Sequence, residues 1–174
     1  MLALVRHALT DWSGSRYCGG TDLGLNEAGR AQLAPLAAYL ASAIGQRPEI
    51  LASPALRCRE TADAIATQLG AEVRTDERLR EVDFGEAEGA TFDDLERRWP
   101  DLAAGVLRDD ADIDWPGGER GALFIARVRS VWDELRARSG DTVVVTHGGP
   151  LRAMLGLAGR PRRLRPAEVA LLPS

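Results

Sequence analysis

The chain contains only two histidines, and each directly follows a short apolar segment typical of a buried strand. His7 comes after Leu2–Val5 and Arg6, and His147 comes after Thr142–Thr146. A lone histidine after a strand is more often a satisfied polar residue than a catalytic group. Two such placements, with no histidine elsewhere, instead favour one shared site.

Two arginines accompany these histidines. Arg6 precedes His7, and Arg57 lies in the first turn of a predicted helix that follows another strand. Guanidinium groups match phosphate oxygens in a bidentate geometry, and the N–H groups of Gly148 and Gly149 could add donors at a helix start. These residues together predict a small, rigid pocket for an anion.

The spacing of apolar residues predicts strands that alternate with helices. The expected strands are Leu2–Val5, Glu49–Ser53, Glu72–Thr75, Thr142–Thr146 and Glu168–Leu172. The expected helices are one capped by Asn26 and kinked or split at Pro35, one over Pro54–Leu69 closed by Gly70, one from Thr91 with Asp94 in a capping box, one over Glu119–Arg138 and one over Leu151–Leu157.

This order predicts an α/β fold: a three-layer α/β/α sandwich with a mostly parallel central sheet. The 174 residues are expected to form a single domain. A helical and loop insertion, over about residues 82–118, should cover the active site. Ligands of such sheets gather at the carboxyl ends of the strands, which is where Arg6, His7, Arg57 and His147 are expected.

The charge pattern excludes several kinds of chemistry. All 22 basic residues are arginine. The chain therefore has neither a catalytic lysine nor the lysine of a phosphate-binding P-loop. A net charge of −4 argues against a general nucleic-acid binder. Residues 76–119 hold 15 acidic residues and 5 arginines, a net charge of −10, so the remainder carries +6. That basic remainder suits a small anionic ligand.

The same sequence predicts a cytoplasmic protein without a membrane segment. No apolar run approaches the ~20 residues that span a bilayer, and Arg6 interrupts the N-terminal apolar segment before a signal peptide could form. Cys18 and Cys58 are expected to be reduced thiols, and neither the cysteines nor the histidines show a zinc-ligand spacing.

Five segments, in order along the chain, resemble the motifs of the histidine phosphatase superfamily, the phosphoglycerate mutase-like clan. They are Leu4–Thr10, Arg16–Leu25, Ser53–Ala62, Leu79–Gly89 and Thr146–Gly148. The resemblance spans nearly the whole chain. Within the clan, the Leu79–Gly89 segment, which resembles the motif that carries the family's acid, and the Gly117–Glu119 loop look like those of the α-ribazole phosphatase and broad-specificity phosphatase branch.

The sequence departs from the pattern of this family at a few positions. Ala8 and Leu9 stand where the family usually has Gly and Glu, Ser13 where many members have Asn, and Arg120 where many have Ser. The first two departures leave the nucleophile intact, because neither replaces a phosphate-binding arginine or histidine. Ser13 and Arg120 bear on substrate specificity.

The resemblance implies a role for each motif residue. His7 would attack phosphorus to form a phosphohistidine, and Glu81 would protonate the leaving alkoxide and later activate water. Arg6, Arg57, His147 and Gly148 would hold the phosphoryl oxygens. No metal or other cofactor is required, since the arginines and histidines supply the positive charge.

Loop residues near these motifs are candidates for the substrate pocket. They are Thr10, Ser13, Cys18, Gly19, Thr21 and Glu119. Glu88 is expected to shape its loop rather than react, and Trp115 to pack in the core or line a pocket. The arginines of residues 160–165 are expected to form a solvated face rather than bind a second anion.

The predicted function is metal-independent hydrolysis of a small-molecule phosphate monoester, such as α-ribazole 5′-phosphate, a sugar phosphate or a nucleotide. Two alternatives stay open: a phosphoglycerate mutase-type phosphoryl transfer, and a phosphate-binding regulatory module with little turnover. The expected partner is the phosphate ester itself, with no nucleic acid or membrane, and a homodimer stays open beside a monomer.

Overall fold

The computed structural model describes residues 1–45, 47–110 and 112–173. Its centre is a five-stranded sheet in the order β3-β2-β4-β1-β5. The strands are β1 (Leu2–Arg6), β2 (Glu49–Ala52), β3 (Val73–Thr75), β4 (Thr142–Thr146) and β5 (Val169–Leu172). The first four are mutually parallel, and β5 pairs antiparallel with β1 at the edge.

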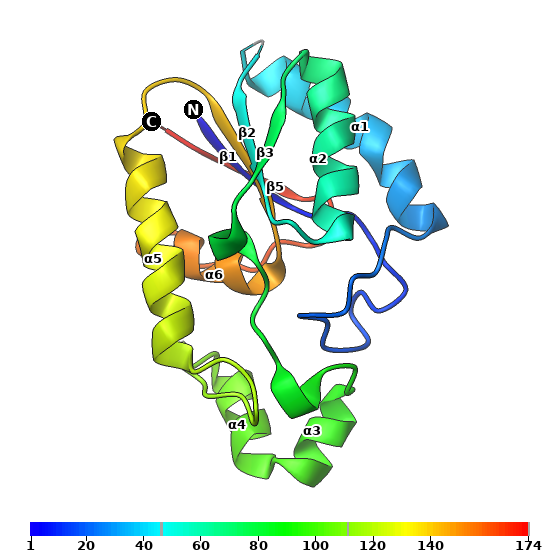
Figure 1. The fold of residues 1–174 in the computed structure, drawn as a ribbon, viewed down its shortest axis with the longest axis vertical. Coiled ribbons are helices and arrows are strands. Elements are labelled where there is room, and N and C mark those ends of the chain that lie inside the picture. Colours follow the sequence, from blue (N-terminus) through cyan, green and yellow to red (C-terminus); the bar gives the residue numbers. More distant parts are fainter. Residues whose placement is uncertain (46, 111, 174) are drawn as a thin grey trace.

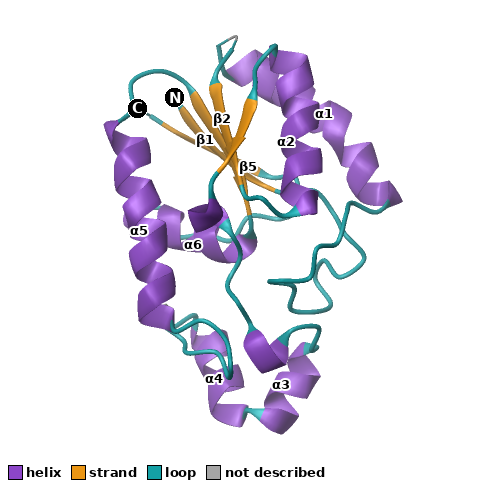
Figure 2. Cartoon of the chain, viewed as in Figure 1, coloured by secondary structure: helices purple, strands orange, loops and turns teal. Residues whose placement is uncertain are grey.

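Helices cover both faces of this sheet (Figures 1 and 2). Helices α1 (Glu27–Ala43) and α2 (Leu56–Leu69) pack on one face. Helices α5 (Gly121–Ala137) and α6 (Gly148–Leu157) pack on the other. The expected three-layer α/β/α sandwich is confirmed, because parallel neighbours in a sheet need helical crossovers that bury both of its faces.

Alternate residues of the central strands enter two separate cores. Ala3 and Val5 of β1 pack beneath α1 and α2, whereas Leu2 and Leu4 pack beneath α5 and α6. Val143 and Val144 of β4 divide in the same way. This alternation explains why the strands are apolar at nearly every position.

Several local signals act as the sequence predicts. Asn26 accepts a hydrogen bond from the Gly29 N–H at the start of α1, and Gly70 ends α2 with φ +64°. Pro35 does not split α1, which runs unbroken from Glu27 to Ala43. Neighbouring turns and the packing of Leu36 and Leu40 in the core hold the helix together around the proline.

Two helices begin elsewhere than expected. Helix α2 starts at Leu56, with Ala55 as N-cap, so Pro54 precedes the helix. Helix α6 starts at Gly148, three residues before the expected Leu151, which makes His147 its N-cap. Pro150 is tolerated inside α6 because the first N–H groups of a helix have no intrahelical acceptor.

The expected insertion lies between β3 and α5. A short 3₁₀ turn, Glu77–Leu79, precedes the expected residues 82–118, which contain a second 3₁₀ turn, Gly85–Ala87, followed by α3 (Phe92–Arg98) and α4 (Pro100–Arg108). Thr91 caps α3 in a capping box with Asp94, as expected. Helix α4 was not expected, although Pro100 at its first turn is a recognised start signal. Figure 1 shows α3 and α4 beyond the end of the sheet at which β1 and β4 finish.

None of the helices in the described ranges combines the length and the apolar content needed to cross a bilayer.

Candidate functional site

Three neighbouring strands deliver polar side chains to the same sheet edge. His7 follows β1, Ser53 follows β2 and His147 follows β4, and these strands are adjacent in the order β2-β4-β1. The His7 N–H donates to the Thr146 carbonyl at 3.0 Å. The two imidazole centroids lie 5.2 Å apart with nearly edge-on rings. The parallel topology therefore brings together histidines that are 140 positions apart in the sequence.

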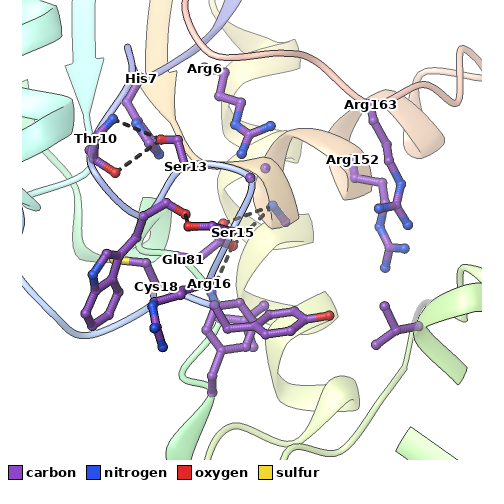
Figure 3. A pocket seen from close by; sticks show the side chains of 18 of the residues that line it. Arg6, His7, Thr10, Ser13, Ser15, Arg16, Cys18, Glu81, Arg152 and Arg163 are labelled. Atoms are coloured by element: carbon purple, nitrogen blue, oxygen red, sulfur yellow. Dashed lines mark hydrogen bonds between the residues drawn. The ribbon is translucent and has the colours of Figure 1, made fainter. Parts of the chain in front are cut away.

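A cavity of about 430 Å³ opens at this edge (Figure 3). The sheet, the loop after β1, the insertion and the C-terminal segment all contribute to its wall. Its charged lining residues are Arg6, Arg16, Arg57, Arg152, Arg163, Glu81 and Asp110. Five arginines against two carboxyl groups give this wall a formal charge of +3, in a chain whose net charge is −4. An anionic ligand fits that excess of positive charge.

Arg6 has donor capacity left over inside the cavity. Its Nη1 donates to the Leu164 carbonyl at 2.8 Å. Its Nε is buried and lacks a hydrogen-bond partner, the only such side-chain nitrogen or oxygen in the described part of the chain. Burial lowers the pKa of Arg6, and nearby Glu81 partly opposes that shift. An unpaired buried guanidinium N–H is costly, so this atom points to an anion that binds here.

Arg57 is buried, and its guanidinium group donates four hydrogen bonds to other residues of the protein. Its Nη groups donate to the carbonyls of Cys18, Gly19 and Thr21 at 2.9–3.2 Å. Its Nε donates to His147 Nδ1 at 3.3 Å. The side chain thereby fixes the loop after β1 and still reaches the cavity wall.

The arginine determines the tautomer of His147. A guanidinium can only donate, so His147 Nδ1 accepts and the ring proton lies on Nε2. That proton is donated to Ser53 Oγ at 2.8 Å. His147 is fully buried and is not among the residues that line the cavity. Burial and the Arg57 charge keep its pKa well below the usual value. Both ring nitrogens are thus occupied by protein groups, where the sequence analysis expected a contact with phosphoryl oxygens.

His7, by contrast, lines the cavity. Its Nδ1 lies 2.8 Å from the Ala8 carbonyl, which can only accept, so Nδ1 carries the proton and Nε2 keeps its lone pair. Burial lowers the pKa of His7 to about 3; the Ala8 carbonyl opposes the shift, and Arg57 and Arg6 reinforce it. The imidazole is therefore neutral at pH 7 and its lone pair is free to act as a nucleophile.

Glu81 lies in the cavity wall beside α6. One carboxylate oxygen accepts from the N–H groups of Val82 at 3.0 Å and Gly149 at 3.1 Å. Burial raises the pKa of Glu81, while these N–H groups, Arg6 and Arg57 oppose the shift. A Cβ at position 149 would lie 2.3 Å from this oxygen, so glycine allows the close approach of the Glu81 carboxyl group. A carboxyl group with a raised pKa can donate a proton near neutral pH.

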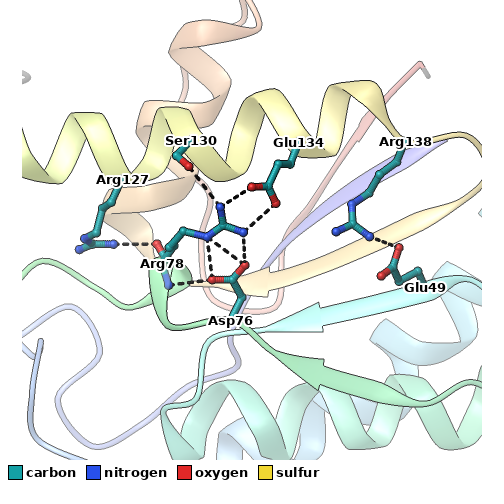
Figure 4. A network of polar contacts seen from close by, with 7 residues as sticks. All are labelled: Glu49, Asp76, Arg78, Arg127, Ser130, Glu134 and Arg138. Atoms are coloured by element: carbon teal, nitrogen blue, oxygen red, sulfur yellow. Dashed lines mark hydrogen bonds and ion pairs between the residues drawn. The ribbon is translucent and has the colours of Figure 1, made fainter.

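The backbone of Glu81 is held by a residue that the sequence analysis missed. Arg127 on α5 donates to the carbonyls of Arg78, Arg80 and Glu81 at 2.8–3.0 Å. It also forms a bidentate pair with Glu119 at 2.7 and 2.8 Å. In Figure 4, Arg127 reaches the same segment that Asp76 and Glu134 stabilise through Arg78. As one of 22 arginines on an ordinary helix, Arg127 gave no sequence signal.

The structure separates the expected pocket residues into two groups. Thr10, Ser13 and Cys18 line the cavity. Gly19, Thr21 and Glu119 do not. The backbones of Gly19 and Thr21 bond instead to Arg57 through their carbonyls and to Glu88 through their N–H groups, and Glu119 is paired with Arg127.

The lining also includes residues that the sequence analysis placed elsewhere. Arg163 belongs to the cluster expected to be solvated, yet it borders the cavity together with Arg152. Tyr17, Phe84 and Trp115 form an aromatic wall, with ring centroids 4.5–5.3 Å apart. Among the described residues, no group of three or more His, Cys, Asp or Glu side chains is placed to hold a metal ion.

The chain is similar in sequence to proteins of a known family. The family model of the histidine phosphatase superfamily (branch 1) matches residues 2–168. A bifunctional protein of Mycobacterium tuberculosis is 39% identical over 160 residues; the match covers 90% of this chain and 43% of that protein, so the chain spans less than half the length of this relative.

Two solved structures are similar over 97% of this chain and 90% of their own. A mycobacterial glucosyl-3-phosphoglycerate phosphatase, solved with VO3, has a TM-score of 0.83 at 31% identity. A phosphoglycerate mutase from Thermus thermophilus has a TM-score of 0.76 at 35% identity.

The burial of the histidines leads to a prediction about their titration. We expect the imidazole carbon resonances of His7 in the free protein to stay at neutral-ring shifts from pH 8 down to about pH 5 in NMR spectra. The pKa of His147 should likewise lie well below its usual value. Added inorganic phosphate should raise the pKa of His7, because an anion opposes the arginine charges. A mid-point between about pH 6 and 7 for His7 in the free protein would contradict this account.

The same shift affects stability. Below about pH 6.5 the unfolded chain protonates both histidines, whereas folded His7 stays neutral until about pH 3. The histidine contribution to the free energy of unfolding therefore falls as the pH drops through this window. Glu81 has a raised pKa in the folded protein, so its contribution to the free energy of unfolding rises as the pH falls.

A pair of glycines on α6 provides a matched test of the Glu81 position. Gly149→Ala should lower the free energy of unfolding by about 1–3 kcal/mol, because its Cβ would collide with the Glu81 carboxylate. Gly156→Ala, on the same helix with open space around it, should be neutral or raise stability by up to about 1 kcal/mol. Chemical denaturation measures both, and equal effects would refute the proposed steric requirement.

Proposed function

The chain belongs to the histidine phosphatase superfamily, and from that premise we propose that it hydrolyses small-molecule phosphate monoesters through a phosphohistidine on His7, without a metal ion. The observation that carries the proposal is a neutral, nucleophilic imidazole beside the unpartnered Nε of Arg6 in an arginine-lined cavity. This combination supplies both a nucleophile for phosphorus and a receptor for the phosphoryl oxygens.

In the first step, the Nε2 lone pair of His7 forms a bond to phosphorus as the ester P–O bond breaks. Glu81, whose pKa burial raises, gives its proton to the leaving oxygen, so an alcohol departs. Arg6, Arg57 and the Gly148 N–H hold the equatorial oxygens and stabilise the negative charge on the transferring group.

In the second step, the Glu81 carboxylate takes a proton from a water molecule that attacks the phosphohistidine. The P–N bond breaks, inorganic phosphate forms, and its release returns the lone pair to Nε2. His147 supports this cycle indirectly, because its Nδ1 orients the Arg57 guanidinium and its Nε2 is anchored on Ser53.

Arginines can replace a metal ion in this chemistry. A divalent cation would neutralise phosphoryl oxygens, and here the fixed guanidinium groups at the cavity carry that charge. The similarity to a mycobacterial phosphatase solved with VO3 supports phosphatase activity. The substrate class comprises monoesters such as α-ribazole 5′-phosphate, sugar phosphates and nucleotides, all of which belong in the assay panel.

Phosphoryl transfer of the mutase type is the second candidate. The similarity to a Thermus thermophilus phosphoglycerate mutase favours it, and the first step would be identical. A mutase returns the phosphoryl group from His7 to an organic acceptor, whereas a phosphatase delivers it to water. Measuring inorganic phosphate release in the presence of excess phosphoglycerate separates the two.

Trapping the intermediate tests the proposal. Rapid mixing with a labelled monoester and alkaline quenching should place acid-labile, base-stable phosphate on the peptide that contains His7. His7→Ala should lose both label and turnover, and His147→Ala should retain weak labelling because Arg6 still binds phosphate. Activity should survive exhaustive chelation. Label on His147, or a requirement for a divalent ion, would overturn the mechanism.

The acid role of Glu81 has a separate signature. Glu81→Gln should lower turnover of alkyl phosphates by roughly 10²–10⁴-fold. With p-nitrophenyl phosphate, whose leaving group needs little protonation, formation of the intermediate should fall by less than about tenfold. The rate of alcohol release is the quantity to compare. Equal losses on both substrates would assign the acid role to another group.

A further inference from the structure

We propose that Gln32 is a positioning residue for the nucleophile: it holds and polarises the peptide unit whose carbonyl accepts the Nδ1 proton of His7. This inference rests on the proposed phosphohistidine mechanism. Gln32 lies on α1 and is not among the residues that line the active-site cavity. It would therefore act on the reaction without touching the substrate.

One peptide unit connects the two side chains. The Ala8 carbonyl lies 2.8 Å from His7 Nδ1, and the Leu9 N–H of the same peptide unit donates to Gln32 Oε1 at 3.0 Å. A backbone N–H can only donate, so the oxygen of the Gln32 amide must face it. Because a peptide unit is planar, an acceptor that fixes its N–H also fixes the direction of its carbonyl.

Helix α1 holds both backbone groups of Leu9. The Leu9 carbonyl accepts from the N–H of Asn26, the N-cap of α1, at 3.1 Å. A Cβ at Gly29 would lie 2.0 Å from the Leu9 carbonyl oxygen, so glycine allows the helix to approach this closely. Gly29 and Gln32 are three residues apart and share a helix face. The place of the Gln32 amide is thus set by the packing of α1 on the loop.

The two preceding N–H groups have acceptors of their own. That of His7 donates to a carbonyl of β4, and that of Ala8 donates to the buried Thr61 hydroxyl on α2 at 3.1 Å. Loss of the Gln32 acceptor would therefore leave this segment tied to the sheet and to α2. Its main effect would fall on the peptide unit that faces His7 Nδ1.

This peptide unit affects the two chemical steps differently. Hydrogen bonds in a chain polarise one another, so acceptance by Gln32 makes the Ala8 carbonyl a stronger acceptor. The His7 ring gains positive charge as Nε2 bonds to phosphorus, and the carbonyl stabilises that charge through Nδ1–H. The charge is lost again when the P–N bond breaks. Gln32 should therefore accelerate formation of the phosphohistidine but not its hydrolysis.

The opposing interpretation is that Gln32 merely satisfies the Leu9 N–H and so keeps the loop in place. In that case, loss of the amide would loosen the loop, weaken phosphate binding and slow both steps alike. The ratio of the phosphorylation rate to the dephosphorylation rate separates the two interpretations.

Three variants test the ratio. Gln32→Met removes the acceptor and keeps the length of the side chain, Gln32→Glu retains an acceptor oxygen, and Gln68→Met is the matched control at an exposed position of α2. Rapid mixing with a labelled monoester gives the rate at which His7 is labelled, and a chase with unlabelled substrate gives the rate at which the label is lost.

We expect Gln32→Met to slow labelling roughly three- to tenfold, the effect of one neutral hydrogen bond. Loss of the label should stay at the wild-type rate or become faster, and the Kd of inorganic phosphate should change by less than about twofold, because the arginines are untouched. Gln32→Glu should label His7 within about threefold of the wild-type rate. Gln68→Met should match the wild type in all three measurements.

NMR spectra of the free protein provide a measurement that needs no turnover. A weaker hydrogen bond moves the resonance of the bonded proton upfield. The His7 Nδ1 proton should therefore move upfield in Gln32→Met and return toward its wild-type position in Gln32→Glu, whereas Gln68→Met should leave it unchanged.

Each outcome bears on one proposal. Equal slowing of both steps, weaker phosphate binding in Gln32→Met, no recovery in Gln32→Glu, or an unmoved Nδ1 proton would overturn the positioning role and leave the phosphatase proposal intact. A wild-type protein that never carries label on His7 would refute the proposed mechanism. The NMR comparison would still decide whether Gln32 positions the imidazole.

Discussion

Burial of the Arg57 guanidinium is the interaction on which the site depends. A buried charge is costly unless hydrogen bonds surround it, and here the carbonyls of residues 18, 19 and 21 and the Nδ1 atom of His147 provide them. Those bonds fix the loop after β1, set the tautomer of His147 and orient one cationic wall of the cavity. The same charge helps to keep His7 neutral. The proposed anion binding and the neutral state of His7 therefore both involve this charge, with burial as the larger cause for His7.

A second set of contacts holds Glu81 in the wall of the cavity. The Gly149 N–H at the start of α6 donates a hydrogen bond to the Glu81 carboxylate, and Arg127 of α5 donates one to the Glu81 backbone carbonyl. The bidentate pair between Arg127 and Glu119 is largely sheltered from solvent, so it orients the guanidinium more strongly than an exposed pair would. The acidic stretch of the chain thus contributes the Glu81 carboxyl group in the cavity wall and the Glu119 carboxylate that pairs with Arg127. Other acids of that stretch cap helices or pair with arginines on the surface.

The cavity has two ends with different chemistry. At the sheet edge, Arg6, Arg57 and His7 line the cavity. At the outer end, aromatic rings and a pair of arginines from α6 and the following loop face the insertion. The first end comes from strand termini whose positions the sheet dictates. The second comes from loops and from α4, which can vary while the sheet stays unchanged, so we expect substrate selection to depend on this end.

The sequence by itself determined the layered α/β fold, most element boundaries and the residues at the strand ends. Apolar runs, caps such as Asn26 and Thr91, and the rule that parallel strands share a carboxyl edge are local or topological properties, so they can be recognised in the sequence alone. Only the tertiary structure decided which side chains reach the cavity and which support it. Glu119 and Arg127 meet across a helix start, His147 turns both nitrogens to Arg57 and Ser53, and Arg163 borders the cavity although Arg160, Arg162 and Arg165 do not. These contacts join residues distant in the chain through side-chain directions that depend on packing, and no periodicity in the sequence encodes them.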